Sequence, residues 1–256
     1  MTQTFKDIIK SYQGLLGIWR SPNCNLAVVG EMLESLNLKL SNVRFLQSEN
    51  YVSSKQELLV ERDIFEIGAF WSIDTKNISG FEHYLLLLKN YYFDSKQKLP
   101  YSMYKYELLG QNLLRLLAQE RLNEFYMELN LLTTEEKNNA FIKYPISMEQ
   151  YLMEGSYDKV FLSKIDIPSR RFTFFKDILL HNIRLGIANR IEAVHESLPV
   201  QHLGNMLYFS ETNDLCSFAN ERQWISDYNG IYFFHKEFKD VEDELIFRAS
   251  AMNMME

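Results

Sequence analysis

The stretch PISMEQYLMEGSYDKVFLSK, residues 145–164, divides the chain into two parts with different patterns. Proline has no backbone N–H to donate within a helix, so Pro145 is expected to end the helix that precedes it. Ser147 is then the predicted N-cap of a short helix that Gly155 ends, and a second short helix is predicted from Tyr157. No carboxylate in the stretch has a base, a metal ligand or a phosphate loop beside it. The pattern therefore indicates a structural junction and not a catalytic site.

Before this junction, apolar residues recur every three or four positions, which predicts a series of amphipathic helices. They cover residues 4–19, residues 25–40, a segment opened by Ser53 and Ser54, residues 80–94 with Ser79 as N-cap, and two segments after Pro100. Short connections between helices of this length make them antiparallel neighbours. Residues 1–165 are therefore expected to form an arm of stacked helical hairpins, a tetratricopeptide-like solenoid without the sequence signature of that repeat.

The part after the junction begins with a long predicted helix. Its apolar residues recur at spacings of three and four over residues 175–198, and Pro199 is expected to stop it. A shorter helix is predicted around residues 201–207. Another is expected to begin with Thr212 or Asn213 as its cap.

The motif WISDYNGIYFF, residues 224–234, is the strongest hairpin signal in the chain because two β-prone runs flank Asn229-Gly230. Three helices followed by a hairpin is the order of a winged helix, so residues 166–239 are expected to form one. A last helix is predicted over residues 240–256. Its apolar stripe consists of Val241, Leu245, Ala249 and Met252.

Composition supports a mainly α-helical protein. Of the 256 residues, 46% are hydrophobic and 24% are charged, and the chain has only 10 glycines and 5 prolines. So few turn residues argue against an all-β fold. The two cysteines fit neither a disulfide framework nor a metal motif, which predicts a reducing compartment. The N-terminus lacks the pattern of a secretory signal, and the longest apolar run, residues 85–88, is far too short to span a bilayer.

Four long strings of mixed residue types resemble the PCI-domain family, and within it the subunits of the 26S proteasome regulatory lid. One is the stretch at 145–164; the others are ERDIFEIGAFWSI (61–73), HYLLLLKNYYFD (83–94) and ELLGQNLLRLLAQERLNEFYMEL (107–129). The resemblance implies helical arms that radiate outward and winged-helix (PCI) domains that pack side by side in an arc. It also implies C-terminal helices that gather in a bundle.

The resemblance further implies a non-catalytic structural and assembly subunit of the lid, which acts in ubiquitin-dependent proteolysis through protein–protein contacts. Its partners would be other lid subunits with PCI domains, with base and ubiquitin-receptor subunits nearby, in the cytoplasm and nucleus. Small PCI subunits of the COP9 signalosome or of initiation factor 3 are alternatives within the family, although Gln150–Tyr157 (QYLMEGSY) favours the proteasome. An RNA- or DNA-binding winged-helix module is the alternative from another class.

Charge argues against nucleic-acid binding. The formal net charge is −7, and from Phe172 to Glu256 there are 7 Lys and Arg residues against 13 Asp and Glu residues. Affinity for nucleic acid comes largely from cations placed against phosphates. The net negative charge of this predicted winged helix therefore argues against nucleic-acid binding. The one local basic pair, Arg170 and Arg171, is equally well explained as a solvated loop. The charged residues of the expected recognition helix are Glu211, Asp214, Glu221 and Arg222.

No catalytic, cofactor or metal site is predicted. The sequence contains no G-x-S-x-G elbow, phosphate-binding loop or dinucleotide-binding turn. The five histidines form no H-x-x-x-H pair, and Cys24 and Cys216 have no adjacent base. We therefore expect a protein that is not an enzyme and that needs no cofactor or metal.

Two segments are predicted to contact partner proteins. If the strand at residues 231–234 is an exposed sheet edge, a partner could add a strand to it and bury Tyr232 or Phe234 in the contact. The alternative is that both strands only cap their own domain. The last helix is too short to be stable alone in water, so its apolar stripe must dock. It would join a bundle with the C-terminal helices of other lid subunits or, alternatively, fold back onto its own winged helix.

Overall fold

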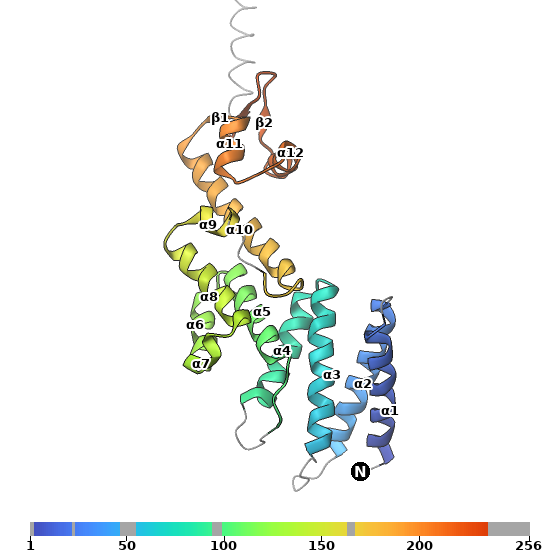
Figure 1. Cartoon of the computed structure of the whole chain (residues 1–256). Helices are drawn as coiled ribbons and strands as arrows, with labels where there is room; N and C mark the ends of the chain where they lie inside the picture. The colour runs from blue at the N-terminus through green and yellow to red at the C-terminus, as the bar shows by residue number, and fades with distance from the viewer. Residues whose placement is uncertain (1–2, 22–23, 47–54, 94–98, 163–166, 235–256) are drawn as a thin grey trace, which may run out of the picture. The chain divides into compact units, whose positions relative to one another are not determined.

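The computed structural model describes residues 3–21, 24–46, 55–93, 99–162 and 167–234. The chain divides into two compact units, Met1–Leu179 and Leu180–Glu256. Within the described residues the chain is helical apart from one small sheet in the second unit (Figure 1). This confirms the predicted fold class of stacked helical hairpins followed by a winged helix. The domain boundaries after residues 165 and 239 stay predictions, and the last helix, at 240–256, lies outside the described residues.

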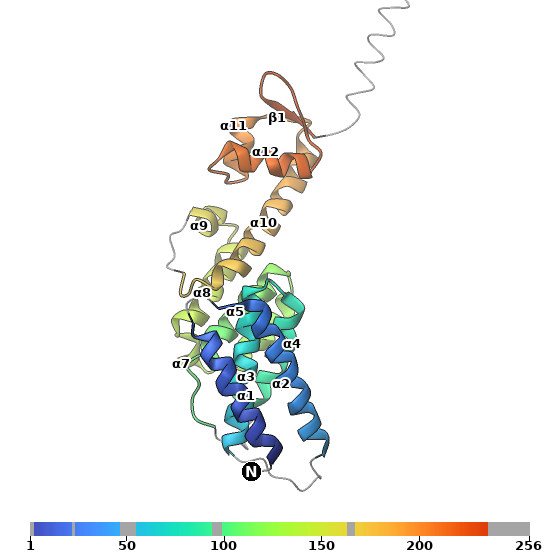
Figure 2. The same cartoon turned by 90° about the vertical axis from the view of Figure 1, so that its right-hand side faces the viewer.

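The first unit is a series of helices, which can be followed in Figures 1 and 2. Its main helix–helix contacts join α1 to α2, α3 to α4, and α5 to α8. The bounds are α1 Gln3–Trp19, α2 Leu26–Leu46, α3 Lys55–Asp74, α4 Ile78–Phe93, α5 Lys105–Ala118, α6 Leu122–Asn130, α7 Thr134–Lys137, α8 Ala140–Met153 and α9 Tyr157–Leu162. Helix α10 spans Phe172–Val194, and its first part, as far as Leu179, also belongs to this unit.

Large aromatic side chains fill the core of the first unit. Phe81 on α4 meets Phe175 on α10 with ring centroids 5.2 Å apart, and Phe172 packs edge-on against Tyr144 of α8 at 5.8 Å. Burying each such side chain contributes roughly 1.5–3 kcal/mol. These aromatic residues of the helical part therefore serve packing.

The prediction that Pro145 ends a helix is wrong. Helix α8 runs through it from Ala140 to Met153, and its N-cap is Asn139, whose side chain accepts a hydrogen bond from the N–H of Phe141 at 3.0 Å. Ser147, the predicted cap, therefore lies inside the helix. An internal proline costs about 3 kcal/mol, but packing on α5 buries more than enough apolar surface to offset it. The fully buried residues of α8 include Ile142, Tyr144 and Met148.

The predicted cap of α4 is displaced as well. Asn77, and not Ser79, caps this helix, because its side-chain oxygen accepts a hydrogen bond from the N–H of Gly80 at 2.9 Å. Glu82 lies three residues after Ser79, where it would complete a capping box with Ser79, but it forms an ion pair with Arg121 at 2.9 Å. Asparagine is as good an N-cap as serine, so sequence preference alone did not separate the two positions.

The second unit has the element order of a winged helix. After the second half of α10 come β1 Ser197–Pro199, α11 Val200–Met206, α12 Thr212–Glu221, β2 Ile225–Ser226 and β3 Ile231–Phe233. The predicted hairpin is thus confirmed as β2 and β3. The predicted cap at Thr212 or Asn213 is wrong, since α12 has Glu211 at its N-cap position, without a side-chain capping bond.

The sheet order is β1-β3-β2, with both pairings antiparallel. Strand β1 was not predicted: the long helix ends at Val194, and the chain then forms a strand that includes Pro199. Proline is tolerated there because β1 is an edge strand. Since β3 lies between β1 and β2, the hypothesis that residues 231–234 form an exposed edge is wrong.

Candidate interaction surfaces

Trp224 is the centre of the winged-helix core. Its ring lies 5.7 Å from that of Phe218 on α12, 6.3 Å from Tyr232 and 5.0 Å from Phe234. Tyr232 is only 7% exposed, and Phe234 is partly buried against the same cluster. The structure thus brings these two predicted contact residues together as core residues. Their role in partner binding stays a prediction.

The hydroxyl of Tyr232 donates a hydrogen bond to the sulfur of Cys216 at 3.4 Å. This bond, together with burial, raises the pKa of Tyr232 to about 12. The phenol therefore stays neutral at physiological pH, as expected for a packing residue.

Glu192 on α10 fixes the far end of α12 and the start of the hairpin. Its carboxylate accepts a hydrogen bond from the indole N–H of Trp224 at 2.7 Å. It also accepts two bonds of 2.7 Å from the guanidinium of Arg222, which reaches Asn189 as well, at 2.6 Å. Sequence reasoning missed Glu192 because its partners lie about thirty positions away and no local motif links them.

Arg222, the basic residue expected on the recognition helix, is already bound in an ion pair with Glu192. Arg222 is held by α10, while Glu211, Asp214 and Glu221 are exposed on or beside α12. A winged helix that reads DNA needs free cations at this position to meet the phosphates. The described part of this surface is acidic, which fits a protein partner better than nucleic acid.

The two edges of the sheet are β1 and β2. Each has one side that no described strand of the chain pairs with, and such edges can accept a strand from a partner. Pro199 removes one backbone donor from β1. On β2, Ile225 is 43% exposed, so this edge combines backbone groups with an apolar side chain.

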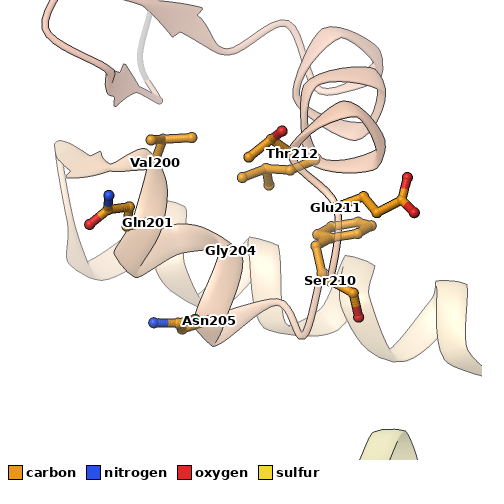
Figure 3. Close-up of a pocket in the computed structure, with 9 residues that line it drawn as sticks. Val200, Gln201, Gly204, Asn205, Ser210, Glu211 and Thr212 are labelled. Atoms are coloured by element: carbon orange, nitrogen blue, oxygen red, sulfur yellow. The ribbon is translucent and has the colours of Figure 1, made fainter.

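A pocket of about 340 Å³ lies between α11 and the start of α12 (Figure 3). Gln201 and Asn205 line it from α11, and Glu211 and Thr212 from the start of α12. Its one charged lining residue is Glu211. Ser210 and Thr212 add hydroxyl groups, but no histidine, lysine, cysteine or second carboxylate is among the lining residues, so the lining suits a binding surface.

The loop that closes this pocket is held rigidly. The guanidinium of Arg184 lies 4.4 Å over the ring of Phe209 and donates to the carbonyl oxygens of Leu207 at 3.0 Å and Tyr208 at 3.2 Å. Tyr208 has a φ of 56°, a left-handed conformation that is uncommon for tyrosine. These bonds compensate for that strain.

Other classes of site were sought across the part of the chain that the structure describes. In that part, no three His, Cys, Asp or Glu side chains are grouped as a metal ion requires. Cys24 and Cys216 are free thiols. None of the helices described is both long and apolar enough to cross a bilayer. The predicted contact residues of the last helix, Val241, Leu245, Ala249 and Met252, lie outside the described residues.

Comparison with known proteins links these features to one family. The profile of the CSN8/PSMD8/EIF3K family matches residues 103–243. The chain is 35% identical to the 26S proteasome regulatory subunit RPN12 of Saccharomyces cerevisiae over 208 residues, which is 78% of this chain and 75% of that protein. It is 31% identical to the 26S proteasome non-ATPase regulatory subunit 8 of Caenorhabditis elegans over 85% of this chain and 84% of that protein. With homolog A of that subunit in Arabidopsis thaliana, the identity is 32% over 75% and 72% of the two chains.

Proposed function

Because the chain belongs to the CSN8/PSMD8/EIF3K family, we propose that it is a non-catalytic structural and assembly subunit of the 26S proteasome regulatory lid. It acts in ubiquitin-dependent protein degradation through protein–protein contacts. One observation carries the proposal: the identity to RPN12 extends over 208 residues, about three quarters of both proteins. The match thus includes residues outside the family profile, and the relatives cited are named as proteasome subunits and not as signalosome or initiation-factor subunits.

The winged helix supplies the surfaces for this role. Edges β1 and β2 and the acidic α12 suit contacts with other lid subunits that carry PCI domains. Base and ubiquitin-receptor subunits would lie nearby, in the cytoplasm and nucleus. The absence of enzymatic activity is part of the proposal, supported by relatives named as regulatory and non-ATPase subunits.

We further propose that residues 240–256 join a bundle with the C-terminal helices of other lid subunits. Burial of Val241, Leu245 and Met252 would contribute roughly 1.5–3 kcal/mol each. Deletion of residues 241–256 should abolish recovery in assembled lid while the melting temperature of the isolated chain is unchanged. A large fall in that melting temperature would mean instead that the helix packs on its own domain.

Affinity purification of the tagged full chain from its native cells tests the proposed function. The expected result is co-purification of regulatory-lid and base subunits of the proteasome. Recovery of signalosome subunits, of initiation factor 3 or of nucleic acid alone would displace the proposal.

A pair of variants tests the role of the β2 edge in the same experiment. Ile225→Lys places a charge on the exposed edge strand and should reduce the recovery of lid subunits severalfold. Ala193→Lys adds the same charge at an exposed residue of α10, outside both sheet edges and α12, and should leave recovery unchanged. Equal loss in both variants would show that added charge, and not the edge, is responsible.

A further inference from the structure

A second pocket, of about 430 Å³, lies in the first unit between α1, α3 and the segment that leads into α5. Its aromatic wall is formed by Trp19, Phe70 and Tyr104, and three arginines also line it: Arg20, Arg62 and Arg171. Pockets of this size and mixed lining are typical of binding sites. It lies outside the winged helix, so the contacts proposed above do not account for it.

The floor of this pocket is a buried and fully paired polar cluster. Glu66, only 3% exposed, accepts hydrogen bonds from the hydroxyls of Ser102 at 2.6 Å and Tyr92 at 2.8 Å. Arg62 pairs with Asp63 at 3.1 Å and donates to the carbonyl oxygen of Pro100 at 2.7 Å. Arg62 offsets only one of the two carboxylates, so the floor keeps a formal charge of −1, although each of these carboxylates is already hydrogen-bonded.

The rim, in contrast, carries positive charge that the described residues leave largely unneutralised. Arg20 is exposed and makes no ion pair with any described residue. Arg171 is held flat, with its guanidinium 4.4 Å from the ring of Phe70 and 5.6 Å from that of Trp19, and its contact with Asp74 is a long one of 3.5 Å. Stacking of this kind holds the guanidinium in place, and its Nη atoms, which are not in the contact with Asp74, can face a carboxylate.

Large apolar side chains stand exposed beside these arginines. Met103 is 80% exposed, Tyr101 64% and Tyr104 48%, although all three line the pocket. Exposed aromatic, Met and Arg side chains together are the composition of protein-interface hot spots. A small metabolite would leave most of this surface in water, whereas a protein segment would cover it.

We propose that this pocket binds a segment of another protein that inserts one aromatic side chain and places a neighbouring carboxylate against Arg20 and Arg171. An acidic segment fits this lining, because Arg20 has no ion-pair partner among the described residues, whereas the two carboxylates of the floor are already hydrogen-bonded. The aromatic wall and the exposed Met103 provide apolar surface against which the aromatic side chain of that segment can pack. The inference goes beyond the proposed function, since it holds whether or not the chain joins the proteasome lid.

Three synthetic peptides test the proposed chemistry. The probe is acetyl-Gly-Asp-Phe-Asp-Gly-amide, and the matched controls replace both Asp by Lys or the Phe by Ala. Binding to the full chain is measured by calorimetry and by tryptophan fluorescence, because Trp19 lines the pocket. The probe should bind at least about tenfold more tightly than either control, a difference of about 1.4 kcal/mol. No binding, or equal binding of the three peptides, would overturn the proposal.

Arginine variants assign the binding to this pocket. Arg20→Glu should weaken binding of the probe at least about fivefold, a difference of about 1 kcal/mol. Arg170→Glu makes the same charge change at an exposed residue that does not line the pocket, and it should change affinity less than twofold. Unchanged melting curves establish that both variants are folded.

Two results from these variants would refute the proposal. Equal weakening of probe binding by Arg20→Glu and Arg170→Glu would show that the overall charge of the chain, and not this pocket, determines the affinity. A dimer of the chain that Arg20→Glu dissociates would assign the pocket to a second copy of this protein, which also overturns the assignment to another protein.

Discussion

The backbone of Gly110 on α5 packs directly against the carbonyl oxygen of Phe141 on α8, so closely that a side chain at position 110 would overlap that oxygen. Pro145, four residues after Phe141, has no N–H with which to close the helical bond to this carbonyl. Gly110 therefore allows α5 to lie close to α8 at the turn where Pro145 leaves one backbone hydrogen bond unformed.

Gly110→Ala should destabilise the first unit by about 1–3 kcal/mol, the usual cost of overpacking. In thermal unfolding this corresponds to a fall of about 2–4 °C per kcal/mol for a unit of this size. Gly17→Ala is the matched control, because Gly17 is also helical but has nothing within 4 Å of an added Cβ. It should leave the melting temperature unchanged or raise it, since alanine favours a helix by up to about 1 kcal/mol. Equal effects of the two substitutions would contradict the close packing.

Glu192→Ala should destabilise the winged helix by about 1.5–3 kcal/mol, because it removes a charged acceptor from Trp224 and Arg222 together. Glu192→Gln should cost less, since the amide oxygen still accepts the indole hydrogen bond. Urea unfolding followed by tryptophan fluorescence measures both. Glu221→Ala, at an exposed position of α12, is the control and should change the unfolding free energy by less than about 0.5 kcal/mol.

The buried carboxyl of Glu66 should make stability rise as the pH falls. Burial raises the pKa of Glu66 above its usual value of 4.5, although bonds from Ser102 and Tyr92 oppose the shift. For an acid with a raised folded-state pKa, the stabilising contribution is complete below the unfolded pKa and is lost as the pH rises through the folded pKa. The unfolding free energy of the wild type relative to Glu66→Gln should therefore increase as the pH is lowered from 7 towards 4.5. A constant difference would show that Glu66 titrates normally.

Glu136 should show the opposite dependence. Burial acts against the shift, but bonds from Lys105, the N–H of Thr133 and Tyr106 outweigh it and lower the pKa of Glu136 to about 2. The stabilising contribution of Glu136 is therefore present above pH 4.5 and is lost as the pH falls from 4.5 towards 2. Glu136→Gln should cost about 1.5–3 kcal/mol at pH 7, with the cost shrinking below pH 4.5.

The neighbouring substitution Glu135→Gln tests whether that effect is specific. Glu135 lies in the same first turn of α7 but is exposed. It should change stability by less than about 0.5 kcal/mol at either pH. A similar pH dependence for both variants would mean that the charge of the helix terminus, and not the paired site, is responsible.

Sequence pattern was sufficient where the structure is decided locally. The 3.6-residue periodicity located the helices of the first unit because one face of each must be buried. Asn229-Gly230 located the hairpin because Gly230 adopts a φ of 73°, which glycine allows without strain. The long strings resembling the PCI-domain family pointed to the family to which the chain belongs.

Predictions from the sequence pattern were wrong or missing where a contact with a distant part of the chain determines the local structure. Pro145 stays inside α8 because α5 packs there, and the local rule for proline does not include that contact. Strand β1 forms only because β3 lies beside it. The pocket at Trp19 and Arg171 joins side chains about 150 positions apart in the sequence, so neither periodicity nor motifs could bring them together.

The central position of β3 also sets the order in which the winged helix can fold. Strands β2 and β3 are joined by a tight turn, so pairing them closes a short loop at little cost in entropy. Strand β1 must wait for β3, because Ser197 pairs with Phe233 across a far longer loop that holds α11 and α12. We therefore expect the hairpin to form first and β1 to join it afterwards. In stopped-flow measurements, Gly230→Ala should slow folding, whereas Leu198→Ala should mainly accelerate unfolding.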